Sequence, residues 1–547
     1  MTPETQRQPS LLDASCDSFV YDLAALSPTE ATAMGIEGFD GELQDFSPEY
    51  YQSVADRTRE MVADIDALDD CTYEADDEDD FDEVDEVTAA ALRDRLVLQL
   101  ELHHHREDLR CLNNIASPVQ EIRDTLLLMP SDTPEQKEAI RSRISKIPRA
   151  LEGYKESLKE AASTGRVAAI RQINEVIGQC NALADGDLLD NLGTSGEVEA
   201  AKRAFEEFSS WLSAELQPQA PSEDAFGRER YERFSRLFVG FPVDLDEAYE
   251  WGLDRVAEIT AEQEKIARQL YGEGTSPRTA MRQLDNEERY TLHGQDALVE
   301  WMQSTADRVI KDLDGKYFDI DEAVRPIECK IDPAGTGGIF YTGPSDDFTR
   351  PGRMWWSVPE GQDTFHTWQE LTTVHHEGAP GHHLQIGAAM TQPDLNLWRR
   401  VACWNSGHGE GWALYAEALM AELGYMDDPG FRMGLLDAQR FRAARVVVDI
   451  GLHLGKMMPD NSGKWDKAHM RTFMRENTAM DDANLAFEVN RYLGWAGQAP
   501  SYALGQRLWQ QTREEAVAQG MSVRDFHSKA LALGSIPMAI LRETLLD

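Results

Sequence analysis

The segment 375–385 reads His-His-Glu-Gly-Ala-Pro-Gly-His-His-Leu-Gln and constrains this chain more than any other stretch. A catalytic zinc ion takes imidazole and carboxylate ligands from three side chains, and a further carboxylate can accept a proton from its water. The usual arrangement is His-Glu-x-x-His on one helix, which places two imidazoles one turn apart. Here the fourth residue after His376 is Pro380, and the next histidines are His382 and His383.

A regular helix cannot bring His376 and His382 to one metal ion. At 100° per residue, the sixth residue after His376 points to nearly the opposite side of the helix. The proline between Gly378 and Gly381 removes a backbone donor, and the glycines permit unusual dihedral angles, so we expect a bulge or a broken turn. Such a break returns His382 to the metal and leaves Glu377 as the general base. 

His383 is the alternative second ligand. It falls on the same helical face as His376, but about two turns away, roughly 10 Å along the axis. We therefore favour His382 and keep His383 as the alternative.

Glu410 is the predicted third ligand, 28 residues after His382. It stands between two glycines where an apolar helix begins, and a buried acid there is costly unless it meets a cation. Glu417 lies seven residues further on the same face and either orients a ligand histidine or is an ordinary residue at the rim of the core. Four histidines within 375–383, from 13 in the chain, are hard to explain by packing alone. A site for one zinc ion is predicted.

This set of side chains predicts amide hydrolysis without a covalent intermediate. Zinc activates a water molecule, and Glu377 takes its proton and passes it to the leaving amine. No alternative nucleophile emerges, because the six cysteines form no Cys-x-x-Cys pair and no Gly-x-Ser-x-Gly motif occurs.

Several motifs resemble the bacterial domain-of-unknown-function 885 family, whose members are inferred to be zinc metallopeptidases. The matching segments, with the metal motif first, are 373–385, 410–417, 439–453, 488–492, 497–505, 350–353 and 28–32. Ala496 departs from the family pattern, which has proline before the Gly-Gln pair. More distantly, the set is similar to the helical carboxypeptidases and oligopeptidases of the gluzincin group. That resemblance implies that Tyr502 donates a hydrogen bond to the oxyanion and that His453 assists. From its residue type alone, Tyr502 is as readily a side chain that bridges core and water.

Composition limits the location and the partners. With 41% hydrophobic residues and a mean hydropathy of −0.49, the chain is expected to be soluble and able to bury a large core. Neither a membrane span nor an apolar signal segment is visible, so a cytoplasmic location is predicted. The 98 acidic residues against 53 basic ones give a net charge of −45, which disfavours nucleic acid as a partner. The acidic block 69–86 is expected to be a solvated loop.

Helical periodicity dominates the chain. Helices are predicted at 87–113, 133–162, 165–216, 222–238, 243–271 and 294–314, and over most of the chain after residue 365. Strand patterns at 324–331, 339–342 and 353–358 predict a small antiparallel sheet before the metal motif. Within it, 355–358 is either an edge strand that pairs with substrate backbone or a plain structural hairpin.

The predicted fold is therefore mainly α, a large helical metallopeptidase-like unit with a small sheet beside a deep cleft. Residues 1–320 would form a helical wall and lid, and 321–547 the catalytic part. By family analogy the substrate is a short peptide or a peptide-like amide. Arg440, Arg445 or Arg491 either binds a substrate carboxylate or serves as a structural ion-pair partner. A hydrolase of a non-peptide amide and a non-catalytic metal or peptide binder are the alternatives, and the oligomeric state is open.

Overall fold

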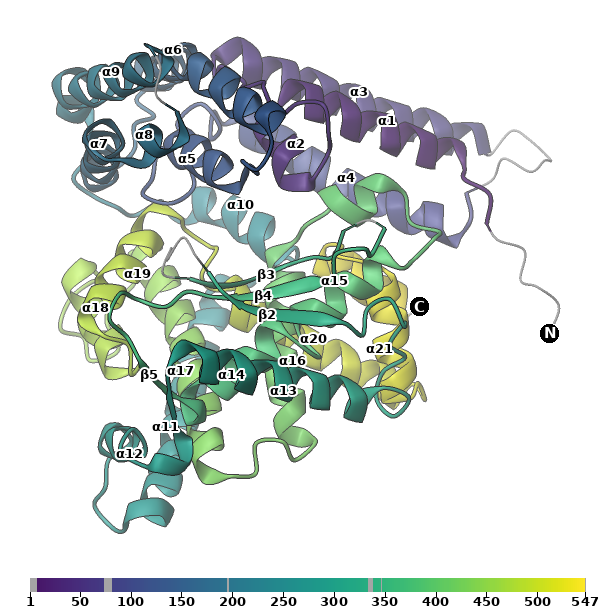
Figure 1. The fold of residues 1–547 in the computed structure, drawn as a ribbon, viewed down its shortest axis with the longest axis vertical. Helices are drawn as coiled ribbons and strands as arrows, with labels where there is room; N and C mark the ends of the chain where they lie inside the picture. The colour runs from purple at the N-terminus through teal and green to yellow at the C-terminus, as the bar shows by residue number, and fades with distance from the viewer. Residues whose placement is uncertain (1–6, 73–80, 194–195, 333–337, 346, 547) are drawn as a thin grey trace. The chain divides into compact units, whose positions relative to one another are not determined.

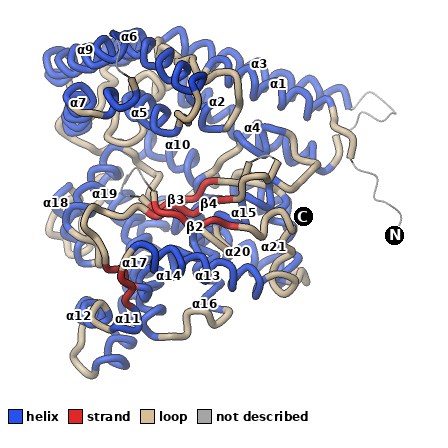
Figure 2. Tube along the Cα trace, in the orientation of Figure 1, coloured by secondary structure: helices blue, strands red, loops and turns tan. Residues whose placement is uncertain are grey.

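The computed structural model describes the chain except residues 1–6, 73–80, 194–195, 333–337, 346 and 547. The described chain is mainly helical with two small sheets, as predicted (Figure 2). It packs as two units. The first comprises Met1–Phe226 with Asn396–Ala402 and Asn490–Trp495, and the second comprises the remainder. This boundary lies well before the expected division at 320, and the role of 1–320 as a wall and lid stays a prediction.

The first unit consists of helices (Figure 1). Its helices are α1 (Leu11–Leu26), α2 (Pro28–Met34), α3 (Pro48–Thr72), α4 (Glu83–His104), α5 (Pro118–Leu128), α6 (Pro134–Ser163), α7 (Ile170–Asp185), α8 (Leu188–Leu192) and α9 (Gly196–Trp211). Of these, α5 to α9 share an apolar core. The unit also contains short π-helices at Leu212–Leu216 and Trp398–Ala402 and a 3₁₀ helix at Gln217–Gln219. Helices α6 and α7 both pack on α9, and the core there includes Tyr154 and Phe205.

The second unit carries both sheets and the metal motif. Its helices are α10 (Arg228–Val239), α11 (Leu245–Tyr271), α12 (Pro277–Leu284), α13 (Gln295–Leu313), α14 (Thr367–Glu377), α15 (His382–Met390), α16 (Ser406–Glu422), α17 (Pro429–His453), α18 (Lys467–Glu476), α20 (Ser501–Ala518), α21 (Val523–Ala532) and α22 (Met538–Leu546), with a short turn at Glu288–Tyr290. Helix α19 (Asp482–Gly494) belongs partly to each unit. The most extensive packing joins α16 to α20 and α17 to α11 and α14.

Sequence signals for helix ends were reliable where a cap or a glycine marked them. Thr133 caps α6 through the backbone N–H of Gln136, and Pro134 takes the first turn. Gly240 ends α10 with a φ of 67°. The prediction of one helix over 87–113 was too long, because α4 ends at His104 and Arg106 takes a φ of 60°, outside the helical region.

The larger sheet is mixed, which corrects the prediction of an antiparallel sheet. Strand β4 (Gly352–Trp356) lies between β2 (Ile327–Ile331), which is parallel to it, and β3 (Ile339–Thr342), which is antiparallel. The other sheet pairs β1 (Thr291–His293) with β5 (Thr364–His366) antiparallel. Alternating hydrophobicity does not specify pairing order, so the insertion of β4 between β2 and β3 could not be read from the pattern.

This topology also overturns the interpretation of 355–358 as a substrate-pairing edge. Trp355 and Trp356 belong to β4, which has a neighbour on each side, so their backbone groups already pair within the sheet. Helices α13, α14 and α15 all contact this sheet, which therefore lies against the helices that carry the metal motif (Figure 1).

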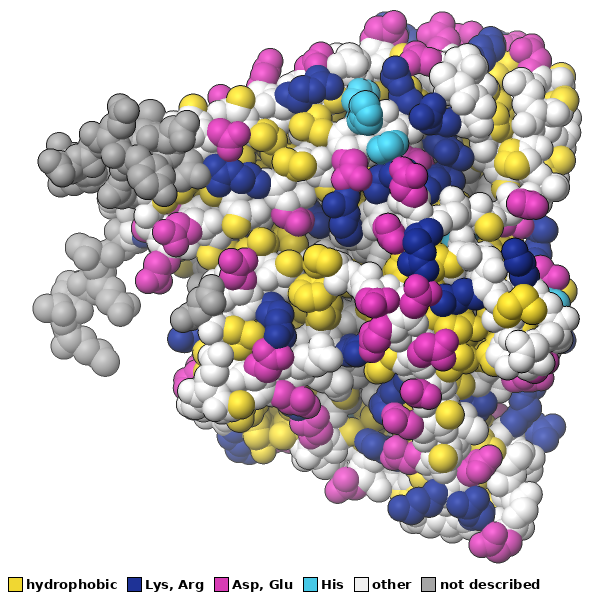
Figure 3. Space-filling view, turned by 180° about the vertical axis from the view of Figure 1, so that it is seen from behind, with side chains coloured by type: hydrophobic (Ala, Val, Ile, Leu, Met, Phe, Trp, Pro, Cys, Tyr) yellow, Lys and Arg dark blue, Asp and Glu magenta, His cyan; other side chains and the backbone are white. Residues whose placement is uncertain are grey.

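The acidic block 69–86 is only partly described. Helix α3 reaches Thr72 and α4 begins at Glu83, so both ends of the block are helical, and residues 73–80 lie outside the described part. Elsewhere, acidic and basic side chains are interspersed on the face shown in Figure 3. Among the described helices, none is both long and apolar enough to cross a membrane.

Candidate metal centre

The two predicted histidine ligands lie on two successive helices. Helix α14 ends at Glu377 with Gly378 as its cap, and α15 begins at His382. The expected bulge is therefore a complete break in the helix. It brings the rings of His376 and His382 together, with centroids 4.9 Å apart and planes perpendicular.

Gly381 and Trp412 stabilise this break. The backbone N–H of Gly381 donates to the carbonyl of His375 at 3.1 Å, and a Cβ atom at Gly381 would lie 1.9 Å from the carbonyl oxygen of His376. Only glycine fits there without moving the backbone. The indole N–H of Trp412 on α16 donates to the carbonyl of Pro380 at 2.8 Å. The turn is thereby fixed to the helix that carries the third ligand.

His376, His382 and Glu410 converge as one group. Oε2 of Glu410 lies 3.3 Å from Nε2 of His376 and 3.6 Å from Nε2 of His382. The three ligand atoms lie within 4.8 Å of one another, and both histidines are buried. Two imidazoles and one carboxylate are the ligand types of catalytic zinc sites. Within the described residues this group could hold a metal ion.

Close packing of α16 against α20 positions Glu410. The side chain of Asn405 caps α16 by accepting from the N–H of His408, and Glu410 follows in the second turn. A Cβ atom at Gly411 would lie 2.5 Å from the carbonyl carbon of Gly505 on α20. Gly411 therefore allows α16 and α20 to pack closely. The sequence alone showed only that glycines flank Glu410.

Glu417 stands behind His376 on the side away from Glu410. Its Oε1 lies 2.7 Å from Nδ1 of His376, and its Oε2 accepts a hydrogen bond from the hydroxyl of Thr372. Glu417 is only 1% exposed and lies against Nδ1 of His376, which favours a carboxylate that orients this candidate ligand over an ordinary residue at the rim of the core. Thr372, one helical turn before His376, was not anticipated. In contrast, Nδ1 of His382 is buried and makes no hydrogen bond with the described residues.

The electrostatics of the group favour a cation between its members. Burial alone lowers the pKa of His376, but the carboxylates of Glu410 and Glu417 outweigh it and raise that pKa to about 10. Burial acts to raise the pKa of Glu410, yet the two imidazoles hold it well below its usual range. Metal ligands must give up their protons, so a divalent ion bound here would replace the proton that these carboxylates favour on His376.

Glu377, the predicted general base, lies in a buried environment. It is the last residue of α14, 7% exposed, and burial raises the pKa of its carboxyl, an effect that the neighbouring His376 and His382 oppose. A carboxylate whose pKa is raised accepts a proton more readily at neutral pH.

The other histidines of the motif are engaged elsewhere. Nδ1 of His383 lies 2.9 Å from the hydroxyl of Tyr341 on β3, and its Nε2 lies 2.7 Å from the carbonyl of Val324. His383 therefore connects α15 to the sheet side, and the geometry favours His382 as the ligand. Nδ1 of His375 lies 3.3 Å from the carbonyl of Ala379. Burial lowers the pKa of both His375 and His383 to about 4.

Tyr502 and His453 occupy different surroundings. Tyr502 is half-buried at the start of α20, and the guanidinium of Arg445 lies 5.0 Å from the centre of its ring. His453, at the end of α17, is fully buried and stacks on Tyr231 with ring centroids 5.5 Å apart. The roles implied for both residues by family resemblance stay predictions.

Two of the three candidate carboxylate-binding arginines have partners in the second unit. Arg445 pairs with Glu488 at 2.7 Å. Arg440 donates to Asn477 at 2.9 Å and to Gln263 at 3.1 Å. The third, Arg491, belongs to the first unit.

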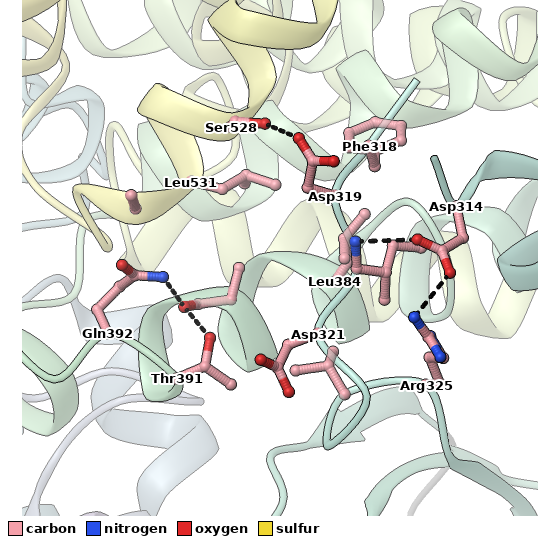
Figure 4. Close-up of a pocket in the computed structure, with 14 residues that line it drawn as sticks. Asp314, Phe318, Asp319, Asp321, Arg325, Leu384, Thr391, Gln392, Ser528 and Leu531 are labelled. Atoms are coloured by element: carbon pink, nitrogen blue, oxygen red, sulfur yellow. Dashed lines mark hydrogen bonds and ion pairs between the residues drawn. The ribbon is translucent and has the colours of Figure 1, made fainter. Parts of the chain in front are cut away.

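A separate pocket of about 540 Å³ lies beside α15 (Figure 4). Leu384 of that helix lines it, but no member of the metal group does. Two of its acids are paired within the chain: the Ser528 hydroxyl donates to Asp319 at 3.0 Å, and Asp314 pairs with Arg325 at 3.1 Å. The pocket is distinct from the candidate metal centre.

The chain is thus a mainly helical protein with a His-His-Glu group, its two histidines buried, that could hold a metal ion. It belongs to the bacterial family of proteins of unknown function DUF885, whose model matches residues 28–545. This establishes the family that the sequence motifs suggested. No curated protein is similar enough to count as a match.

Three solved structures are similar to the chain to different degrees. A putative lipoprotein from Colwellia psychrerythraea is 22% identical over 98% of each chain, with a TM-score of 0.81. A putative lipoprotein of unknown function from Shewanella oneidensis is 17% identical over 98% of this chain and all of its own, with a TM-score of 0.74. These two share the fold. A Pyrococcus furiosus carboxypeptidase is 11% identical over 97% of this chain and 94% of its own. Its TM-score of 0.35 is too low to indicate a shared fold.

Proposed function

We propose that this protein is a zinc-dependent peptidase that hydrolyses short peptides. One observation carries the proposal: His376, His382 and Glu410 converge within 4.8 Å, and Glu377 directly follows the first of them. When bound, zinc lowers the pKa of a water ligand and polarises a carbonyl. Imidazole and carboxylate donors suit zinc better than Mg²⁺ or Ca²⁺, which prefer oxygen ligands alone.

The chain's own side chains account for the remaining steps. Glu377, buried and with a raised pKa, takes a proton from water and delivers it to the leaving amine. Glu417 holds the imidazole of His376 in one orientation and one tautomer through Nδ1. The hydroxyl of Tyr502 donates a hydrogen bond to the oxyanion. The guanidinium of Arg445 lies beside the ring of Tyr502, and this positive charge makes the hydroxyl a better hydrogen-bond donor.

Glu377→Gln tests the proposal. The purified chain is loaded with zinc, its metal content is measured, and hydrolysis is followed on short peptides and on N-acyl amides. We expect the wild type to cleave peptides and the variant to keep its zinc while its kcat falls roughly 10²-fold to 10⁴-fold. Glu422→Gln, an exposed acid on α16, is the matched control and should change neither quantity.

The panel also separates the two alternatives. Cleavage of N-acyl amides without cleavage of peptides would support a metal-dependent hydrolase that acts on non-peptide amides. Zinc binding by a wild type that turns over no compound would favour a metal-binding protein over an enzyme. A wild-type chain that binds no zinc would overturn the proposal.

The cytoplasmic location also stands as a proposal. The two structures that share the fold are described as putative lipoproteins, so an envelope location is the competing outcome. Fractionation of the producing cells, followed by detection of the chain in the cytoplasmic and membrane fractions, distinguishes the two locations.

A further inference from the structure

An exposed tryptophan lies beside the candidate metal centre. Trp404 directly precedes Asn405, the cap of α16, and its ring centroid lies 6.4 Å from that of His382. Its side chain is 49% exposed, whereas Cys403 and Asn405 on either side are buried. The chain therefore leaves a large apolar ring in contact with water next to a predicted metal ligand.

Gly409 provides the surface on which this ring rests. A Cβ atom at Gly409 would lie 2.3 Å from Cη2 of Trp404 and 2.6 Å from its Cζ2. Any larger residue would push the indole away, because Cβ atoms essentially never approach a ring so closely. Gly409 is also the residue immediately before Glu410. The indole is thus held against the turn of α16 that presents the third candidate ligand, and the ring of His382 lies nearby.

This position distinguishes Trp404 from an ordinary exposed hydrophobic residue. Single apolar side chains at the surface are common and require no explanation. Trp404 instead contacts the helix turn of one predicted ligand and lies near the ring of another. The carboxylate side chain of Glu410 is 19% exposed, so the centre itself is reachable from solvent. Because the indole centroid lies 6.4 Å from that of the His382 ring, a substrate carbonyl at the centre would place its adjacent side chains near the indole.

We infer that Trp404 determines specificity by packing its exposed indole against an aromatic or large aliphatic side chain next to the scissile bond. The inference rests on the proposed peptidase function. Contact of such a side chain with the ring removes apolar surface from water on both partners, and aromatic pairs gain a further stacking contribution. Small substrate side chains such as alanine leave the indole exposed and gain little. The preferred substrates are therefore short peptides with a bulky apolar residue beside the cleaved bond.

Matched peptides test the inference. The zinc-loaded full chain is assayed on Ala-Ala, Phe-Ala and Ala-Phe, each as the same N-blocked amide, with zinc content measured in parallel. We expect Trp404→Ala to lower kcat/KM roughly 10-fold to 100-fold on at least one phenylalanine peptide. Its effect on the Ala-Ala peptide should stay within about 3-fold, with zinc content unchanged. Trp404→Phe should restore most of the preference, because it keeps an aromatic face.

Two further variants make the outcome specific. Tyr317→Ala removes another exposed aromatic ring and should leave the preference for phenylalanine unchanged. Gly409→Ala, which displaces the indole, should reduce the preference in the same direction as Trp404→Ala.

Each alternative outcome has a defined consequence. An equal loss on all three peptides for Trp404→Ala would assign the indole a structural role and overturn the inference. An unchanged preference for phenylalanine in Trp404→Ala would also overturn the inference. If the wild type cleaves Ala-Ala and shows no preference for phenylalanine, the inference about Trp404 is overturned but the proposed peptidase function is not. Failure of the wild type to cleave any peptide overturns the proposed function and the inference with it.

Discussion

Nδ1 of His376 lies 2.7 Å from Oε1 of Glu417, while Nε2 of the same ring faces Glu410 at 3.3 Å. The two acids are seven residues apart on α16, so they are on one face of that helix, and the imidazole spans the distance between them. One ring is thereby oriented by the same helix that supplies the third candidate ligand. Metal affinity should depend on Glu417 although it is not itself a ligand.

Removal of Glu417 should weaken zinc binding without abolishing it. Glu417→Ala leaves Nδ1 of His376 without its carboxylate, and outer-sphere partners of this kind typically contribute about 10-fold to 100-fold in metal affinity. We expect a rise of that size in the zinc dissociation constant, measured by competition with a chelator. Glu422→Ala, an exposed acid on the same helix, should leave the constant unchanged. Equal constants for Glu417→Ala and the wild type would contradict the role assigned to Glu417.

The adjacent histidines His382 and His383 should respond oppositely to substitution. His382→Ala removes a converging nitrogen and should abolish stoichiometric zinc, measured by elemental analysis after dialysis. His383→Ala should keep the zinc and instead lower Tm, because it removes hydrogen bonds to Tyr341 and Val324. Full zinc in His382→Ala together with lost zinc in His383→Ala would reverse the ligand assignment.

Gly381→Ala should destabilise the break between α14 and α15. The new methyl group would lie 1.9 Å from the carbonyl oxygen of His376, and overpacking of this kind typically costs about 1–3 kcal/mol. We expect a lower Tm and weaker zinc binding, because His376 and His382 then lose their mutual placement. Gly178→Ala on α7 is the control: no atom lies within 4 Å of its added Cβ, and alanine should be neutral or stabilising in a helix. A Tm of Gly381→Ala equal to that of the wild type would show that the break tolerates a side chain.

The sequence suggested the three residues of the candidate centre because their residue types and their immediate neighbours are typical of a metal site. The spacing of His376 and His382, together with Pro380, excluded a regular helix, and a break between them was the only arrangement that used both. What the sequence could not specify depends on contacts between distant segments. Thr372 on α14 donates to Glu417 on α16, and Trp412 donates to the carbonyl of Pro380. The sequence spacing of these residues does not predict either contact.

The same distinction applies to the fold. The helix predicted over 133–162 was confirmed as α6, because the signals that start it, Thr133 and Pro134, lie within its first turn. The order of β2, β4 and β3 was not predicted, because each strand pattern records only which face is buried. The division into packed units is likewise hard to read from the sequence, since it depends on which helices share a core.

Asp437 should make stability depend on pH in a direction opposite to that of ordinary surface acids. Its side chain lies on α17 and is 7% exposed, and burial raises the pKa of its carboxyl from 3.8 to about 6 although the N–H of Ala479 and the cation of Arg440 oppose this. Below about pH 3.8 the acid is protonated in both the folded and the unfolded chain. As the pH rises from 3.8 through 6, the unfolded chain loses its proton first, so the stabilising contribution is lost across this window.

Asp437→Asn should remove this dependence. The difference between the two pKa values corresponds to about 3 kcal/mol at most, so the variant should have a higher Tm than the wild type at pH 7.5. The gain should shrink steadily towards pH 4.5, because the folded wild-type carboxyl is then protonated and therefore neutral, as asparagine is. Asp254→Asn, an exposed acid on α11, controls for the loss of one charge from an acidic chain. Thermal unfolding of all three chains across this range measures the effect, and a gain that is the same at pH 4.5 and pH 7.5 would mean that Asp437 does not titrate between them.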